Sequence, residues 1–218
     1  MRKKPLGRPP ASVSAETRSR ILAAARDCFA RLGYGQTTNK DIANAAGITT
    51  GAIYHYYDSK QELFVAVTRE VTDLVFSEFE SVAADQPTFL DKLRAVLDAA
   101  SRLHEHDRTL ARFSAICPIE LQRHPELAAG VGDEVLTRGP TFFRRLVTEA
   151  KAKGELASDL KVHDTANMLV SVTIGLAFLG LLTDNVPTHR GAVVTVERLF
   201  DHGLGADSQA RTTRSRAG

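Results

Sequence analysis

Apolar residues recur along the chain at intervals of three and four positions, which is the spacing of one face of an α-helix. The first such run follows Ser14, a residue that favours a helix N-cap, and Gly33 is expected to end it. Its apolar positions are Ile21, Leu22, Ala25, Phe29 and Leu32. Turn pairs and alternating strand patterns are almost absent along the chain, so the predicted fold class is all-α.

Two short helices are predicted next. Thr38 and Asp41 form a capping-box pattern ahead of a short apolar run, and Gly47 is expected to end that helix. Thr49 can cap a third helix that runs through Tyr54. A tight turn at Gly47 therefore joins the two helices.

Longer helices are predicted in the rest of the chain. Ser59 and Glu62 repeat the capping-box pattern before a long amphipathic run. A later helical run is expected to stop before Pro118, and Pro140 is expected either to kink a helix or to begin a new one. Gly154 is expected to end that helix.

The 19 residues from Thr165 to Thr183 carry no charge, which is about the length of a membrane span. The run contains polar residues and glycines and lacks the aromatic belts that are typical of membrane spans. A helix that is apolar on all sides can also be buried between its own bundle and a partner subunit. We therefore expect no membrane contact here and a homodimer interface instead. The residues expected in that interface are Gly175, Ala177, Gly180 and Leu181.

Charge is distributed unevenly along the chain. Residues 1–60 contain ten Lys/Arg and four Asp/Glu, a net charge of +6, whereas the other residues contain 18 basic and 22 acidic groups, a net charge of −4. A basic first quarter attached to a mildly acidic body predicts one part that meets a polyanion and another part with a different task.

Composition narrows the class of protein. Apolar residues make up 43% and charged residues 25% of the chain, which is typical of a folded soluble protein. Cys28 and Cys117 lie far apart and form no disulfide framework, so a cytoplasmic location is expected. His104 and His106 would point to different sides of a helix, so no metal site is expected. Motifs for catalysis or for a cofactor are not recognisable, and we expect neither an enzyme nor a bound cofactor.

The two short helices around Gly47, which follow a longer supporting helix, predict a helix-turn-helix unit. Such a unit reads DNA when its second helix enters the major groove. The residues that this helix would present are Thr49, Thr50, Gly51, Ala52, Tyr54 and His55. Lys40 and Lys60 add positive charges on either side. On spacing alone, an ordinary three-helix domain with hydroxyl caps remains an open alternative.

A longer set of positions between residues 17 and 63 supports the helix-turn-helix interpretation. These positions are Thr17-Arg18, Ile21-Leu22, Ala24-Ala25, Phe29, Gly33-Tyr34, Thr37-Thr38, Ile42-Ala43, Ala46-Gly47-Ile48-Thr49, Gly51, Ile53-Tyr54, Tyr57, Ser59-Lys60 and Glu62-Leu63. Together they closely resemble the DNA-binding domain of the TetR family of transcriptional regulators. The resemblance implies an all-helical, homodimeric repressor whose C-terminal domain binds a small molecule that releases DNA.

The resemblance also implies which residues contact DNA. They are Thr38, Asn39, Thr49, Thr50, Gly51, Tyr54, Tyr56 and Lys60. The family usually has His followed by Phe where this chain has Tyr56 and Tyr57. Tyr56 can donate a hydrogen bond to a phosphate, but it cannot become cationic as His can.

The first residues suggest a second DNA contact. Gly7-Arg8-Pro9 resembles the core of an AT-hook, in which Arg8 would lie in a narrow A·T minor groove. A solvated basic leader is the alternative.

The sequence predicts four regions of the chain and one function. The regions are a flexible basic arm over 1–13, a helix-turn-helix DNA-binding domain over 14–60, a helical ligand-binding and dimerisation domain over 61–206, and a disordered tail over 207–218. The function is sequence-specific repression at a pseudo-palindromic duplex operator, ended by a small apolar or amphipathic inducer. The alternatives are a partner-controlled regulator and an architectural DNA-binding protein. The residues expected to line the ligand cavity are Phe113, Ile116, Cys117, Phe143, Met168 and Thr173.

Overall fold

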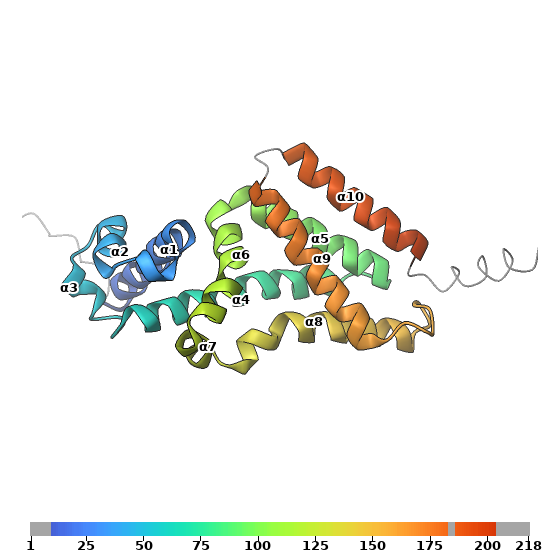
Figure 1. Cartoon of the computed structure of the whole chain (residues 1–218), viewed down its shortest axis with the longest axis horizontal. Helices are drawn as coiled ribbons and strands as arrows, with labels where there is room; N and C mark the ends of the chain where they lie inside the picture. The colour runs from blue at the N-terminus through green and yellow to red at the C-terminus, as the bar shows by residue number, and fades with distance from the viewer. Residues whose placement is uncertain (1–9, 183–185, 204–218) are drawn as a thin grey trace, which may run out of the picture. The chain divides into compact units, whose positions relative to one another are not determined.

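The computed structural model describes residues 10–182 and 186–203. The secondary-structure elements of these residues are ten helices, which confirms the all-α prediction. They are α1 (Pro10–Gln36), α2 (Asn39–Ala46), α3 (Thr50–Ile53), α4 (Lys60–Ala84), α5 (Phe89–His106), α6 (Arg108–Arg123), α7 (Pro125–Val131), α8 (Asp133–Ala152), α9 (Val162–Leu182) and α10 (Val186–Gly203) (Figure 1). Arg8 and the expected tail over 207–218 lie outside the described residues.

Helix α1 differs from the prediction at its start. It begins at Pro10, four positions before the expected N-cap at Ser14, so that part of the prediction was wrong. Proline suits the first turn of a helix because its φ is already helical and it has no N–H group to satisfy. At the other end, Gly33 has φ 76° and ψ 166°, which breaks the regular helix as predicted before the last turn to Gln36.

Two prolines lie inside helices. Pro118 does not end α6, which continues to Arg123, and Pro140 lies within α8 and does not begin a new helix. An internal proline costs about 3 kcal/mol. Each fully buried large apolar side chain contributes about 1.5–3 kcal/mol. The buried side chains of α8 that follow Pro140 are Phe142, Phe143, Leu146, Val147 and Ala150. Their burial outweighs the lost backbone hydrogen bond.

Contacts divide the chain into two compact units. The first unit holds the described residues up to Arg69 together with Ile116–Val131, and the second holds Glu70–Ala115 and the described residues from Gly132 onward. The expected boundary after residue 60 falls at the start of α4, whereas the contacts keep the first turns of α4 in the first unit. The reason is burial, because Leu63, Phe64 and Val67 have no exposed surface.

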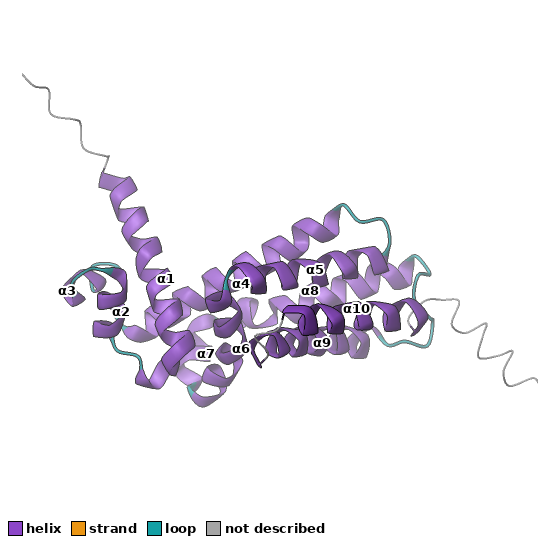
Figure 2. Ribbon diagram, turned by 90° about the horizontal axis from the view of Figure 1, so that it is seen from above, coloured by secondary structure: helices purple, strands orange, loops and turns teal. Residues whose placement is uncertain are grey.

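The second unit is a helical bundle. Helices α5, α8, α9 and α10 pack on one another (Figure 2). Its core residues include Phe79, Leu93, Val96, Leu97, Phe142, Phe143, Leu146, Val147 and Leu169. Apolar burial along these helices is therefore the main stabilising interaction of this unit.

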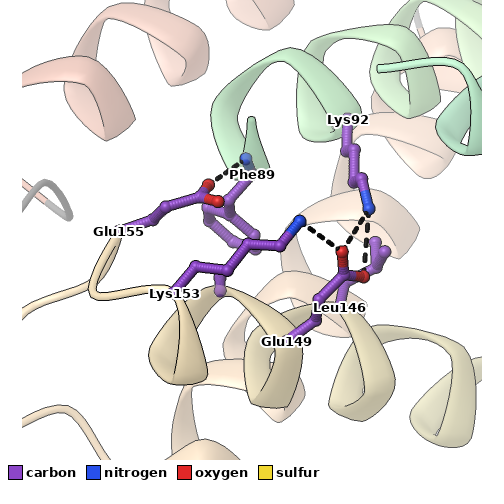
Figure 3. A pocket seen from close by; sticks show the side chains of 7 residues that line it. Phe89, Lys92, Leu146, Glu149, Lys153 and Glu155 are labelled. Carbon is purple, nitrogen blue, oxygen red and sulfur yellow. Dashed lines mark hydrogen bonds and ion pairs between the residues drawn. The ribbon is translucent and has the colours of Figure 1, made fainter. Parts of the chain in front are cut away.

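A charged group at one edge also joins α5 to α8. Lys92 Nζ donates to Glu149 Oε1 at 2.9 Å and to Oε2 at 3.0 Å, and Lys153 Nζ donates to Oε1 at 2.7 Å. Figure 3 shows the three side chains converging beside Phe89. Hydrogen bonds from Lys153 and Lys92 lower the pKa of Glu149 to about 2. The carboxylate therefore stays ionised and keeps both lysines in place at neutral pH.

Helix α9 contains the uncharged run and was predicted as a helix, which is confirmed up to Leu182. Among the described helices it alone is long and apolar enough to cross a membrane by length and composition, and 17% of its most apolar stretch is buried inside the chain. Thr165, Ala166 and Leu169 are buried. Ile174, Phe178 and Leu182 are exposed at successive turns, so one apolar face of α9 is uncovered in the single chain.

Candidate nucleic-acid interface

The start of α2 is fixed by the predicted capping box. Thr38 Oγ1 accepts a hydrogen bond from Asp41 N at 3.2 Å, and Thr38 N donates to Asp41 Oδ2 at 2.9 Å. The hydrogen bonds from Thr38 lower the pKa of Asp41. The carboxylate therefore stays ionised near the helix N-terminus, where a negative charge is favourable. These two residues set the position at which α2 begins.

The turn between α2 and α3 also follows the prediction. Gly47 caps α2 with φ 64°, a left-handed conformation that glycine adopts without strain. Thr49 Oγ1 accepts a hydrogen bond from Ala52 N at 3.2 Å and so caps α3. Helix α3 is only four residues long, and Tyr54 is its C-cap and not a helical residue as expected. Ile53 is completely buried and anchors this short helix.

Two arginines of α1 donate hydrogen bonds to the segment that contains the helix-turn-helix. Arg20 donates a hydrogen bond to Ala46 O at the end of α2, and Arg18 Nε donates to Tyr57 Oη at 3.2 Å. A cation at a helix C-terminus is favoured because the last carbonyl groups have no partner within the helix. No role was predicted for either arginine from the sequence. Arg18 appeared only as one position of the family pattern, and its contact is 39 positions away.

The residues expected to contact DNA lie close together in the first unit, from the start of α2 to the start of α4. The exposed ones are Thr38, Lys40, Thr49, Gly51, Tyr54 and His55, and the partly buried ones are Asn39, Thr50, Tyr56 and Lys60. A Cβ atom built on Gly51 meets no other atom within 4 Å. The packing of the described residues therefore leaves room for a side chain at Gly51.

Asn39 and Tyr54 connect the start of α2 to the end of α3. Asn39 Nδ2 donates to Tyr54 Oη at 3.1 Å, and the Tyr54 side chain is 53% exposed. Because the hydroxyl oxygen accepts this hydrogen bond, its own proton remains able to donate outward. The pair can therefore present a hydrogen-bond donor beside α3.

Lys60 points toward the protein interior. Its Nζ donates to Tyr34 O at 2.8 Å and to Thr37 O at 2.9 Å, and it lies 4.3 Å from the centre of the Tyr34 ring. Burial lowers the pKa of Lys60, and the nearby Glu120 carboxylate opposes that change. From the sequence, this lysine was predicted to be a positive charge that contacts DNA.

The six residues expected to line a ligand cavity are divided between the two units. Ile116 and Cys117 belong to the first unit, and Phe143 and Met168 belong to the core cluster of the second. Burial raises the pKa of the Cys117 thiol to about 11, so it is an unreactive core residue. Phe113 is completely buried in the second unit.

Of the six, Thr173 lines a small recess in the second unit, with a cavity volume of about 10 Å³. The other residues around it are Leu97, Ala100, Ser101, Leu176, Ala177 and Val193. Ala177, which was expected in a subunit interface, therefore faces this recess, whereas Gly175 is exposed and Gly180 and Leu181 are partly buried. The described residues contain no group of three or more His, Cys, Asp or Glu that could hold a metal ion.

The site and the fold define a class of protein. Two capped helices around a glycine turn, supported by α1 and joined to a separate helical unit, are typical of a DNA-binding transcriptional regulator. The profile of the family described as "Bacterial regulatory proteins, tetR family" matches residues 21–67.

Similarity to individual proteins extends well beyond this segment. The transcriptional repressor KstR2 of Rhodococcus jostii is 34% identical over 150 residues, which cover 67% of this chain and 71% of the repressor. The regulator UidR of Escherichia coli K12 is 28% identical over 160 residues, 73% of this chain and 79% of UidR. The structure of FadR from Bacillus subtilis in complex with stearoyl-CoA covers 80% of this chain and 95% of its own, with a TM-score of 0.68 and 23% identity. This chain belongs to the TetR family of transcriptional regulators.

Proposed function

We propose that this regulator is a cytoplasmic, non-enzymatic repressor that binds a pseudo-palindromic operator as a homodimer and leaves it when a small apolar or amphipathic ligand binds. The observation that carries the proposal is the surface of α3. Its exposed and partly exposed positions are small or hydrogen-bonding, and Gly51 has open space where a side chain would lie. A surface of this kind lets a helix backbone approach the edges of base pairs.

The proposed contacts divide into two kinds. Thr50 and Gly51 would face base edges in the major groove, where a threonine hydroxyl can pair with several bases. Tyr54, Tyr56 and Lys40 would donate to phosphates and so fix the register of the protein on the duplex. Thr38, Thr49 and His55 are exposed beside them and complete the proposed surface. Asn39 would act through its hydrogen bond to the Tyr54 hydroxyl. Arg8 would add a minor-groove contact from the basic arm.

The proposed dimer follows from the uncovered face of α9. One short recognition helix reads too few bases for useful discrimination, so two copies are needed on a palindrome. Ile174, Phe178 and Leu182 are exposed along α9, and Val194 and Leu199 are exposed on α10. Large exposed apolar patches are rare on monomers and mark sites of association. The interface that we propose therefore centres on this face of α9, with Gly175 in it.

The proposed binding site for the inducer is the recess beside Thr173. Its lining carries no charged side chain, and it lies between α5, α9 and α10. Its cavity volume of about 10 Å³ is far below the ~300–1,000 Å³ of most ligand sites. A ligand would therefore widen it by separating these helices. The similar FadR structure holds stearoyl-CoA, so an acyl-CoA is the first candidate for this chain.

Replacing Gly51 with alanine tests the DNA surface. We expect Gly51→Ala to leave thermal stability unchanged or slightly higher, because alanine favours a helix by ~1 kcal/mol over glycine. Operator affinity should fall at least about tenfold, because a methyl group would meet base edges. Fluorescence anisotropy with a duplex selected from random sequences measures the operator affinity of the native protein and of the variant. The matched control is Gly35→Ala, because a Cβ atom at Gly35 also meets no other atom within 4 Å. Equal binding by Gly51→Ala and the native protein would contradict the proposed surface, and a native protein without operator preference would favour an architectural role.

Placing a charge on the exposed face of α9 tests the dimer. Phe178→Glu should give monomers in sedimentation equilibrium, because a buried unpaired carboxylate is strongly unfavourable in an interface. Leu74→Glu on α4 is the matched control, since Leu74 is 44% exposed and Phe178 is 47% exposed. We expect the control to remain dimeric. A Phe178→Glu protein that stays dimeric would place the interface elsewhere.

Adding stearoyl-CoA tests the inducer. It should raise the melting temperature of the native protein and lower operator affinity, with a stabilisation of ~2.7 kcal/mol at a concentration 100 times the dissociation constant. Ala100→Phe should fill the recess and remove both effects while DNA binding without ligand persists. If stearoyl-CoA raises the melting temperature of Ala100→Phe as much as that of the native protein, the ligand does not bind in this recess.

A further inference from the structure

Lys60 makes a set of contacts that a phosphate-binding lysine would not need. It is the first residue of α4, and its Nζ donates to the backbone carbonyls of Tyr34 at 2.8 Å and Thr37 at 2.9 Å. The same Nζ lies 4.3 Å from the centre of the Tyr34 ring, within the range of a cation–π interaction. All of these groups belong to the first unit.

The two carbonyls lie at a place where the backbone needs partners. Gly33 breaks α1, the helix ends at Gln36, and α2 begins after Thr38. The last carbonyls of a helix have no partner within it, and a lysine can supply the missing hydrogen bonds. Lys60 therefore connects the end of α1 to the start of α4. Its two acceptors, Tyr34 and Thr37, lie 26 and 23 positions before it in the sequence.

The segment that Lys60 holds leads directly into the proposed DNA surface. Thr37 is buried, and its hydroxyl donates to Gly33 O at 2.7 Å and lies 3.2 Å from Cys28 O. The next residue, Thr38, caps α2. A shift of the Thr37 carbonyl would therefore move the N-terminus of α2, and the Asn39 contact would carry that shift to Tyr54 beside α3.

We propose that Lys60 is a positioning residue, which sets the placement of α2 and α3 through the Tyr34 and Thr37 carbonyls and does not bind a DNA phosphate. The proposal rests on the DNA surface described above. A phosphate contact and a positioning contact have different consequences. A phosphate contact adds to binding of every duplex and to its salt dependence, whereas a positioning contact adds only where α3 must match base edges.

The experiment measures affinity for the operator and for a random duplex between 50 and 200 mM salt, values chosen to cover the range over which phosphate contacts change affinity steeply. Lys60→Met removes the charge and both hydrogen bonds but keeps an apolar stem. Lys60→Gln removes the charge but keeps N–H donors. Lys40→Met is the matched control, because Lys40 is exposed on α2. Urea unfolding of each variant gives the folded fraction under the assay conditions.

We expect Lys60→Met to lose about tenfold in operator affinity, the effect of one hydrogen bond to a charged group, with little change for the random duplex. Its salt slope should equal that of the native protein, and Lys60→Gln should recover part of the operator preference. Lys40→Met should reduce the slope by about one and weaken both duplexes alike. If Lys60→Met is unfolded, Lys60→Gln is measured in its place, with an unchanged slope expected.

A different pattern would overturn the proposal. If Lys60→Met and Lys60→Gln both reduce the salt slope by about one and weaken both duplexes equally, Lys60 is a phosphate contact. Full native operator preference in both variants would show that the contact positions nothing that DNA reads. If the native protein itself binds both duplexes equally, the proposed operator function fails. That outcome is separate, because it appears before any variant is compared.

Discussion

A helix of four residues, such as α3, cannot hold its own position. Isolated helices shorter than about 12–15 residues are marginal in water, so α3 depends on contacts from the rest of the first unit. Its last residue, Ile53, is buried, Thr49 caps it, and the left-handed Gly47 sets its direction from α2. Without any one of these contacts, α3 would lose its fixed position, and so would the exposed residues that it carries.

This constraint explains why several contacts converge on the inner side of the proposed DNA surface. Arg20 and Lys60 each donate to backbone carbonyls near helix ends, and these contacts add to the caps that fix α2 and α3. The outward side then needs only small or hydrogen-bonding residues such as Thr50 and Gly51. Thr50 and Gly51, the positions proposed to face base edges, make none of these anchoring contacts, so they can change with the operator. The second unit has its own apolar core and can carry a separate task.

Local interactions could be predicted from the sequence, whereas contacts between distant residues could not. The capping box of Thr38 and the glycine turn at Gly47 involve residues within five positions, so the pattern alone predicted them. The contacts of Lys60 span more than twenty positions and depend on how helices pack, so no local pattern predicts its inward direction. The interface residues in α9 were hard to choose for another reason: a helix without charges on any side gives no signal for which face its own bundle covers.

Amide hydrogen exchange with and without operator DNA tests the central claim most directly. Exchange reports on backbone amides one segment at a time, so it shows where DNA touches the folded protein. The account predicts that the operator, more than a random duplex of equal length, slows exchange over residues 38–57, which hold α2, α3 and their turn. Slowed exchange confined to segments outside 38–57 would contradict the account, because DNA would then be bound without the helix-turn-helix.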